Sequence, residues 1–138
     1  MATTNYFKNV IMGNVFKTAT GTALPSNYYI GLSSTTPTTA GGNVTEPSSS
    51  NTGYSRVRIT TLLSQPSNGV ITNSSDISFP ESTAAWFSSA SPATHYCIFT
   101  AETGGQLLMY SPLTNPRAID ANTVVTIKAQ NLVLQLTD

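Results

Sequence analysis

Residues 94–110, THYCIFTAETGGQLLMY, decide how this chain folds. Two arms rich in aromatic and aliphatic residues flank a small loop that ends in Gly104-Gly105. Because glycine tolerates positive φ, a Gly-Gly pair between two such arms predicts the turn of a β-hairpin. Both arms are nearly all apolar, as in strands that are buried on both faces. We therefore predict that this hairpin forms the middle of the core.

Further strands are expected on both sides of the hairpin. Short segments rich in β-branched and aromatic residues alternate with Gly, Pro, Asn and Ser, and Asn68-Gly69 is a strong type I′ turn signal. Seven or eight short strands at regular spacing are typical of a β-sandwich or barrel. We expect one mainly β domain over residues 1–138, an antiparallel β-sandwich or barrel-like domain with one short N-terminal helix and long polar loops. The expected strands outside the hairpin are residues 27–33, 53–60, 70–72, 76–80, and a closing hairpin of 123–128 and 131–137.

The N-terminal segment, residues 1–26, holds the one expected helix and a linker ahead of the β-domain of residues 27–138. Apolar side chains recur every three or four positions over residues 4–17, and Thr3 or Thr4 can cap the helix start. The resulting apolar stripe covers either the open edge of the chain's own sandwich or a neighbouring subunit. Its members are Tyr6, Phe7, Val10, Ile11, Val15 and Phe16.

Residues 34–52 form a long segment of Ser, Thr, Pro, Gly and Asn, in which Glu46 is the one charged residue. A loop of this length in a compact domain is usually functional or mobile. We expect an extended loop that a partner stabilises, with Thr38, Thr39 and Glu46 as candidate interface residues. On that interpretation, deleting residues 40–50 leaves a folded domain that no longer joins its assembly.

Alternation over residues 53–60 predicts a second candidate surface. Val57 and Ile59 are expected to point inward, while Tyr54, Arg56 and Arg58 share the outward face. Arg and Tyr are enriched at interface hot spots, so these three residues are either a contact patch or an ordinary solvated face.

Composition narrows the function classes. Charged residues make up 9% of the chain, against roughly 25% for an average soluble domain. Six basic and six acidic side chains cancel, so nothing in the charge draws the protein to nucleic acid or to an anionic membrane. The N-terminus has neither a basic region nor a sustained apolar run, so we expect no signal peptide, no membrane span, and synthesis in a cytoplasm.

The chain has few residues that could act as a catalytic nucleophile, acid or base. His95 is its one histidine and Cys97 its one cysteine, and no motif around them resembles a thiol protease. Both are expected to be structural core residues. One histidine, one cysteine and six scattered carboxylates make a zinc site improbable, and neither Gly-Gly pair has the spacing of a phosphate-binding loop. We expect no enzyme, no cofactor and no metal.

Several segments, taken in order, resemble a group of small virion structural proteins of tailed bacteriophages, often labelled tail-fibre or minor structural proteins. The matching pieces are residues 29–33 (YIGLS), Thr36-Pro37, Glu46-Pro47, 53–57 (GYSRV), 77–80 (ISFP), Trp86, 94–99 (THYCIF), 104–108 (GGQLL), Pro116-Arg117 and 132–136 (LVLQL). The resemblance implies a non-enzymatic β-domain attached to a phage particle.

Two locations on the particle follow from the resemblance. The first is a capsid decoration or cement protein, a homo-oligomer with a trimer favoured, that binds the major capsid protein through the 34–52 loop and the N-terminal segment. The alternative is a tail-fibre, collar or baseplate component that takes part in host attachment. In that case aromatic residues can stack on sugars, although such residues are more often core; the candidates are Tyr28, Tyr29, Tyr54 and Trp86. We favour the capsid on small size, low charge and a loop without a core of its own.

Overall fold

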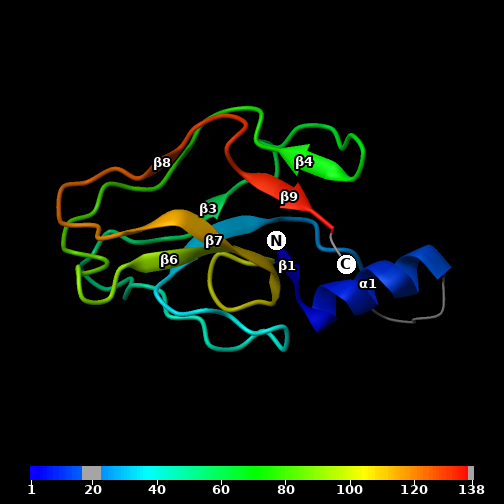
Figure 1. Cartoon of the computed structure of the whole chain (residues 1–138), viewed down its shortest axis with the longest axis horizontal. Helices are drawn as coiled ribbons and strands as arrows, with labels where there is room; N and C mark the ends of the chain where they lie inside the picture. The colour runs from blue at the N-terminus through cyan, green and yellow to red at the C-terminus, as the bar shows by residue number, and fades with distance from the viewer. Residues whose placement is uncertain (17–22, 137–138) are drawn as a thin grey trace.

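The computed structural model describes residues 1–16 and 23–136. These residues contain one helix and nine strands, and the strands form three antiparallel sheets (Figure 1). The largest sheet has the order β1-β7-β6-β2-β3, and the two small sheets are β4-β9 and β5-β8. The described strands form no closed barrel, so the mainly β prediction is confirmed in its sandwich-like form. The elements are β1 (Ala2–Thr3), α1 (Asn5–Phe16), β2 (Tyr29–Ser33), β3 (Val57–Arg58), β4 (Val70–Thr72), β5 (Ile77–Ser78), β6 (Ala93–Phe99), β7 (Leu107–Arg117), β8 (Thr126–Ile127) and β9 (Val133–Gln135).

The predicted hairpin is confirmed as the centre of the largest sheet. Strands β6 and β7 pair with each other and are flanked by β2 and β1. Ile98 pairs with Met109 and Phe99 with Leu107, so Leu108 is an extra residue in β7. This bulge lets Leu108 and Met109 both contact the main core, although neighbouring residues of a regular strand face opposite sides.

Positive φ angles occur where the sequence requires turns. Gly104 and Gly105 have φ of 62° and 70°, and they end the loop that joins β6 to β7. Asn68 and Gly69 have φ of 53° and 77° just before β4, which confirms the predicted turn. Two consecutive positive φ values are the requirement of a type I′ turn.

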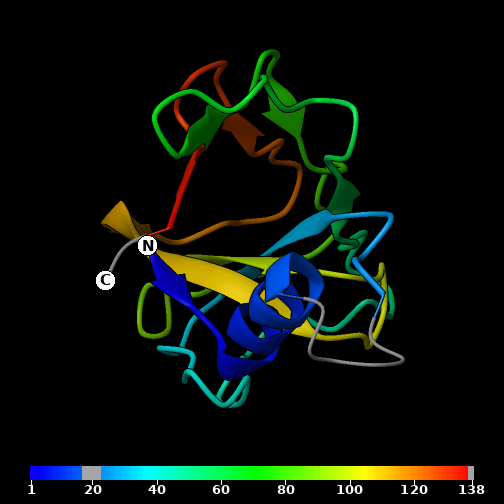
Figure 2. The ribbon, with the colours of Figure 1, turned by 90° about the vertical axis from the view of Figure 1, so that its right-hand side faces the viewer.

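Buried side chains lie on both faces of the central sheet. The main core lies between this sheet and the two small sheets, which form the upper layer in Figures 1 and 2. Its largest fully buried members come from both layers: Ile30, Ile59, Ile77, Leu108 and Leu132. On the other face, a small cluster of Cys97, Phe99 and Leu107 is packed by Val44 of the 34–52 loop and by Tyr110.

The closing hairpin predicted from residues 123–137 is wrong. Strand β8 pairs with β5 and β9 pairs with β4, so the two strands do not pair with each other. Asn73, fully buried, explains the difference, because its amide donates to the carbonyls of Ser75 and Lys128 while its Oδ1 accepts from the Leu132 backbone N–H at 2.9 Å. The predicted end of the last strand at residue 137 lies outside the described residues.

Helix α1 begins one residue later than predicted, and the predicted end at residue 17 lies outside the described residues. Thr4 caps it: Thr4 Oγ1 accepts a hydrogen bond from the Phe7 N–H at 3.4 Å. The same hydroxyl donates to the Leu107 carbonyl at 2.6 Å, so the cap also fixes the helix start to the bulge of β7.

Candidate functional site

The predicted contact patch on residues 53–60 is wrong in two of its three members. Only Val57–Arg58 forms a strand here, so the alternation that placed Tyr54 and Arg56 on an exposed face does not extend over the segment. Tyr54 is buried, and the Arg56 side chain is 9% exposed. Arg58 is exposed as predicted, with its Nε donating to Asn27 Oδ1 at 2.9 Å.

Arg56 lies at the centre of an internal ionic cluster. Its Nη2 is 2.6 Å from Glu46 Oε1, and its Nε donates to Glu46 Oε2 at 3.0 Å. Nη1 donates to the carbonyls of Ala101 and Gly104 at 2.9 and 2.8 Å. The guanidinium carbon lies 3.4 Å from the centroid of the Phe99 ring. The Arg56 side chain, which lies just before β3, therefore joins the 34–52 loop to the turn of the central hairpin.

Tyr54 completes this cluster. Its hydroxyl donates to Glu46 Oε2 at 2.6 Å and accepts from the Leu32 N–H at 3.1 Å. Burial, with the Glu46 carboxylate beside it, raises the pKa of the Tyr54 hydroxyl. Its ring packs edge-on against Trp86, with 5.2 Å between centroids. Tyr54 and Trp86 are thus core residues, and Tyr28 and Tyr29 are half-buried, so none of the four presents a fully open face to a sugar.

The 34–52 loop makes its own contacts with the domain, contrary to the expectation that only a partner stabilises it. Besides the contacts of Glu46, the Ser33 hydroxyl of β2 accepts from the Thr45 N–H at 3.0 Å, and within the loop the Asn43 amide donates to the Thr36 carbonyl at 2.7 Å. The Thr39 carbonyl accepts from the Asn5 N–H at 2.8 Å, which ties the loop to the start of α1. Deletion of residues 40–50 removes Glu46, so we now expect it to destabilise the domain.

Thr38 and Thr39 remain exposed, as an interface requires. Their role in binding stays a prediction. Glu46, the third loop residue proposed for the interface, instead faces inward, with a side chain 18% exposed.

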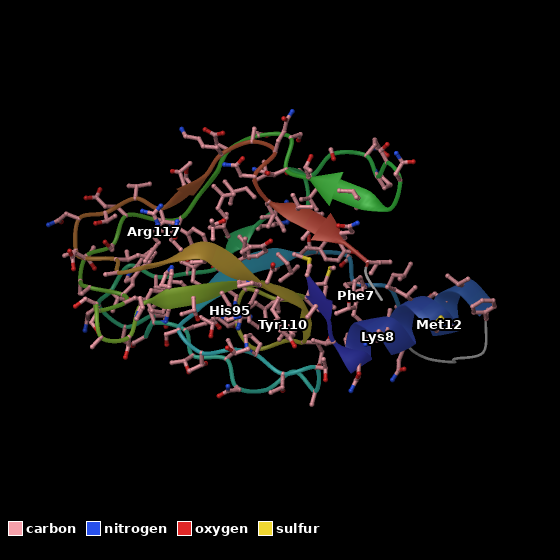
Figure 3. The ribbon with its side chains drawn as sticks, viewed as in Figure 1. Phe7, Lys8, Met12, His95, Tyr110 and Arg117 are labelled. Atoms are coloured by element: carbon pink, nitrogen blue, oxygen red, sulfur yellow. The ribbon has the colours of Figure 1, made fainter. Side chains whose placement is uncertain are left out.

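The apolar stripe of α1 divides into two halves. Phe7 and Val10 pack on the domain, whereas Val15 and Phe16 are both 64% exposed, and Met12, which is not part of the predicted stripe, is 55% exposed beside them. Figure 3 shows Phe7 beside the sheets and Met12 farther out, where the helix leaves the body of the molecule. The first alternative stated for the stripe is confirmed for the first turns, which cover the domain, whereas cover by a neighbouring subunit stays a prediction for the last turns.

Two hollows flank the start of α1. One is an apolar cavity of about 330 Å³ between the helix and the β4-β9 sheet, lined by residues that include Phe7, Leu63, Ile71, Leu108, Leu134 and Leu136. The other is a more polar recess of about 450 Å³, whose lining includes Ala2, Thr3, Lys8, Thr39, Tyr110 and Pro112. Neither hollow could be predicted from the sequence, because their walls come from segments far apart in the chain.

The described residues offer no obvious reaction centre. Cys97 is fully buried, and burial raises the pKa of its thiol to about 12. His95 is half-buried, with Nδ1 at 2.9 Å from Thr94 Oγ1, and burial lowers the pKa of its imidazole. Within residues 1–16 and 23–136, no three His, Cys, Asp or Glu side chains gather in a way that could hold a metal ion. Nor is any helix in that part of the chain long and apolar enough to cross a membrane.

Comparison with known proteins gives the class of the molecule. A family described as podophage GP4 fiber I protein gp80 matches residues 2–135. The chain belongs to this family. It is therefore a phage virion structural protein of the fibre type, as the ordered segments of the sequence implied. No curated protein matches the chain. The family description agrees better with the tail-fibre alternative than with capsid decoration, which we had favoured.

Proposed function

We propose that this protein is a structural component of a podophage tail fibre and takes part in attachment of the particle to its host. The observation that carries the proposal is the match to a fibre protein family over residues 2–135. The structure supports it through a β-domain from which an apolar helix end projects. The proposal makes the protein non-enzymatic and places its partners among the other virion proteins.

The projecting end of α1 is the surface that we assign to assembly. Met12, Val15 and Phe16 stand at positions i, i+3 and i+4, the spacing with which a helix inserts apolar anchors into a groove. Lys8 is exposed on the same side of the helix, one turn before Met12, so the apolar end begins after this charge. We expect a homo-oligomer, with a trimer favoured, in which this helix end contacts a neighbouring copy or the tail protein that carries the fibre. Light scattering on the purified chain measures the subunit number.

Capsid decoration is the second candidate, and its main support has weakened. That reading took the 34–52 loop as a segment without contacts of its own, whereas Glu46 joins the loop to Arg56 inside the domain. Small size and low charge still fit both locations.

The location on the particle decides between these readings. Antibody labelling of purified particles, with quantification of the protein against the major capsid protein, is the test. Label on the tail and a copy number far below that of the capsid protein support the fibre proposal. Label over the whole head at a copy number near that of the capsid protein would contradict it.

A surface variant tests the assembly role of α1. Replacing Val15 and Phe16 by Ser leaves the folded β-domain intact, since both side chains are 64% exposed, but is expected to prevent incorporation into particles. Val124→Ser is the matched control, because Val124 is 53% exposed on a loop far along the chain from α1. Equal incorporation of both variants would remove α1 from the assembly surface.

A further inference from the structure

The polar recess beside the first turn of α1 has the size and the lining of a small-ligand site. Its volume of about 450 Å³ lies within the range of roughly 300–1,000 Å³ that is usual for ligand pockets. Its walls come from β1, β7, α1 and the tip of the 34–52 loop. The loop tip is held in place, because the Thr39 carbonyl accepts the Asn5 N–H at 2.8 Å. The recess is thus built by the fold rather than by one mobile segment.

Lys8 has the one charged side chain among the described residues that line the recess. Its ammonium is exposed, and no ion pair joins it to a residue of the described chain. None of the described residues that line the recess carries a carboxylate. A lysine with three donors and no internal partner attracts an anionic group, such as a carboxylate or a phosphate.

Tyr110 gives the recess an aromatic wall. It pairs with Ala2 on β1 and with Cys97 on β6, so its backbone is fixed from both sides. Its side chain packs against the cluster of Cys97, Phe99 and Leu107 and remains partly accessible. The His95 ring, 6.4 Å away between centroids, supports it from the neighbouring strand. Figure 3 shows Tyr110 on the sheet and Lys8 on the first turns of α1, with strand β1 close to both.

Hydrogen-bonding groups surround this wall. Thr39 contributes an exposed hydroxyl, and β1 is an edge strand whose outer backbone groups have no strand partner within the described sheet. An aromatic face, several hydroxyl or backbone partners and one cation suit a ligand that has an apolar ring face, many hydroxyl groups and one negative charge.

We propose that this recess binds a sugar that carries a carboxylate or phosphate group, with the ring against Tyr110 and the anionic group at the Lys8 ammonium. The inference rests on the proposed role in host attachment and gives that role a ligand class, acidic saccharides of the cell surface. It also assigns Thr39, one of the interface residues predicted from the sequence, to a sugar contact.

The test is a titration of the ¹⁵N-labelled full chain, followed by amide chemical shifts. The probes are D-glucuronate, D-glucose 6-phosphate, D-glucose and inorganic phosphate. We expect one or both acidic sugars to shift the amides of Ala2, Lys8, Thr39 and Tyr110, with glucose about fivefold weaker. The stronger of the two acidic sugars identifies carboxylate or phosphate. No shift at these amides, equal shifts with glucose, or equal shifts with inorganic phosphate would overturn the proposal.

Variants separate the charge from the ring. Lys8→Gln should weaken acidic sugars about fivefold and leave glucose unchanged, whereas Tyr110→Leu keeps an apolar side chain but should weaken every sugar. Lys128→Gln is the control, since Lys128 is an exposed lysine on another part of the surface. Should Tyr110→Leu fail to fold, Lys8→Gln decides alone, and an unchanged affinity for acidic sugars in Lys8→Gln contradicts the proposal.

Failure here is distinguishable from failure of the fibre role. Label on the tail without sugar binding removes only the recess proposal. Sugar binding by a protein that labels the head instead removes the fibre role.

Discussion

Arg56 Nη2 lies 2.6 Å from Glu46 Oε1, and this ion pair joins the residue just before strand β3 to a loop made almost entirely of small polar residues. The guanidinium also donates to two carbonyls of the central hairpin turn. The pair is largely desolvated, with side chains 9% and 18% exposed, so its two charges depend on each other. The shape of the long loop is thus set from inside the domain.

Glu46→Gln should destabilise the protein strongly, because it leaves the Arg56 charge buried without a counter-ion. Removing one partner of a buried pair costs about 3–5 kcal/mol, and the partial exposure of Glu46 places the expected loss near about 3 kcal/mol. Urea denaturation measures it. Lys128→Gln is the control, because it breaks a pair between two exposed side chains, Lys128 at 72% and Asp76 at 49% exposure. It should change the free energy of unfolding by less than about 0.5 kcal/mol. Similar losses in both variants would show that the Arg56–Glu46 pair contributes no more to stability than an exposed ion pair.

The same cluster leaves no room for a side chain at Gly31. A Cβ at this position would lie 2.7 Å from Glu46 Oε2 and 2.9 Å from the Tyr54 hydroxyl oxygen. Gly31→Ala should therefore cost about 1–3 kcal/mol of unfolding free energy through overpacking. Gly42→Ala is the matched control, since its nearest atom, Thr38 Oγ1, would be 3.6 Å away, an ordinary contact. Equal thermal midpoints for the two variants would mean that the Glu46 and Tyr54 side chains can move aside without loss of stability.

What could be predicted from the sequence was local in origin. The hairpin around Gly104-Gly105 and the turn at Asn68-Gly69 could be predicted, because residues within a few positions of each turn determine its positive φ angles and its apolar arms. The closing hairpin failed because Asn73, more than fifty residues away from Leu132, supplies hydrogen bonds that part the two segments.

The candidate surface failed for a related reason. Alternation assigns outward faces only where a strand persists, and β3 has two residues. Glu46 is the single charge in a long neutral loop, but a carboxylate needs a cationic partner only where it is buried, and the sequence does not show that burial. The partner of Glu46 could not be chosen from the sequence, because Arg56 and Arg58 are two residues apart and a strand pattern places both on the same face.

Cys97 should be inert in the folded protein. Burial raises the pKa of its thiol to about 12, so the thiolate that reacts with iodoacetamide is scarce at pH 8. Labelling of the native chain is expected to be slower than labelling in urea by on the order of a hundredfold. In the unfolded chain the thiol ionises near pH 9, so the stability associated with this group is complete below that pH and is lost between about pH 9 and 12. Rapid native labelling at pH 8 would place Cys97 at the surface.

Two adjacent threonines provide the sharpest test of the N-terminal segment. Thr3 Oγ1 is buried and has no hydrogen-bond partner among the described residues, whereas Oγ1 of Thr4, also a buried residue, donates to the Leu107 carbonyl and accepts from the Phe7 N–H. Valine has nearly the shape of threonine without the hydroxyl. Thr3→Val should therefore be neutral or stabilise the protein by about 1 kcal/mol, since it removes an unpaired buried polar group.

Thr4→Val should instead destabilise it by about 1–3 kcal/mol, because the helix loses its cap and the Leu107 carbonyl loses its donor. Urea denaturation of both variants gives the comparison. The opposite signs are the expected result, since the two substitutions delete the same atom at neighbouring positions. Equal losses would mean that Thr3 Oγ1 has a partner after all, so that β1 and the start of α1 are held by two hydroxyl anchors instead of one.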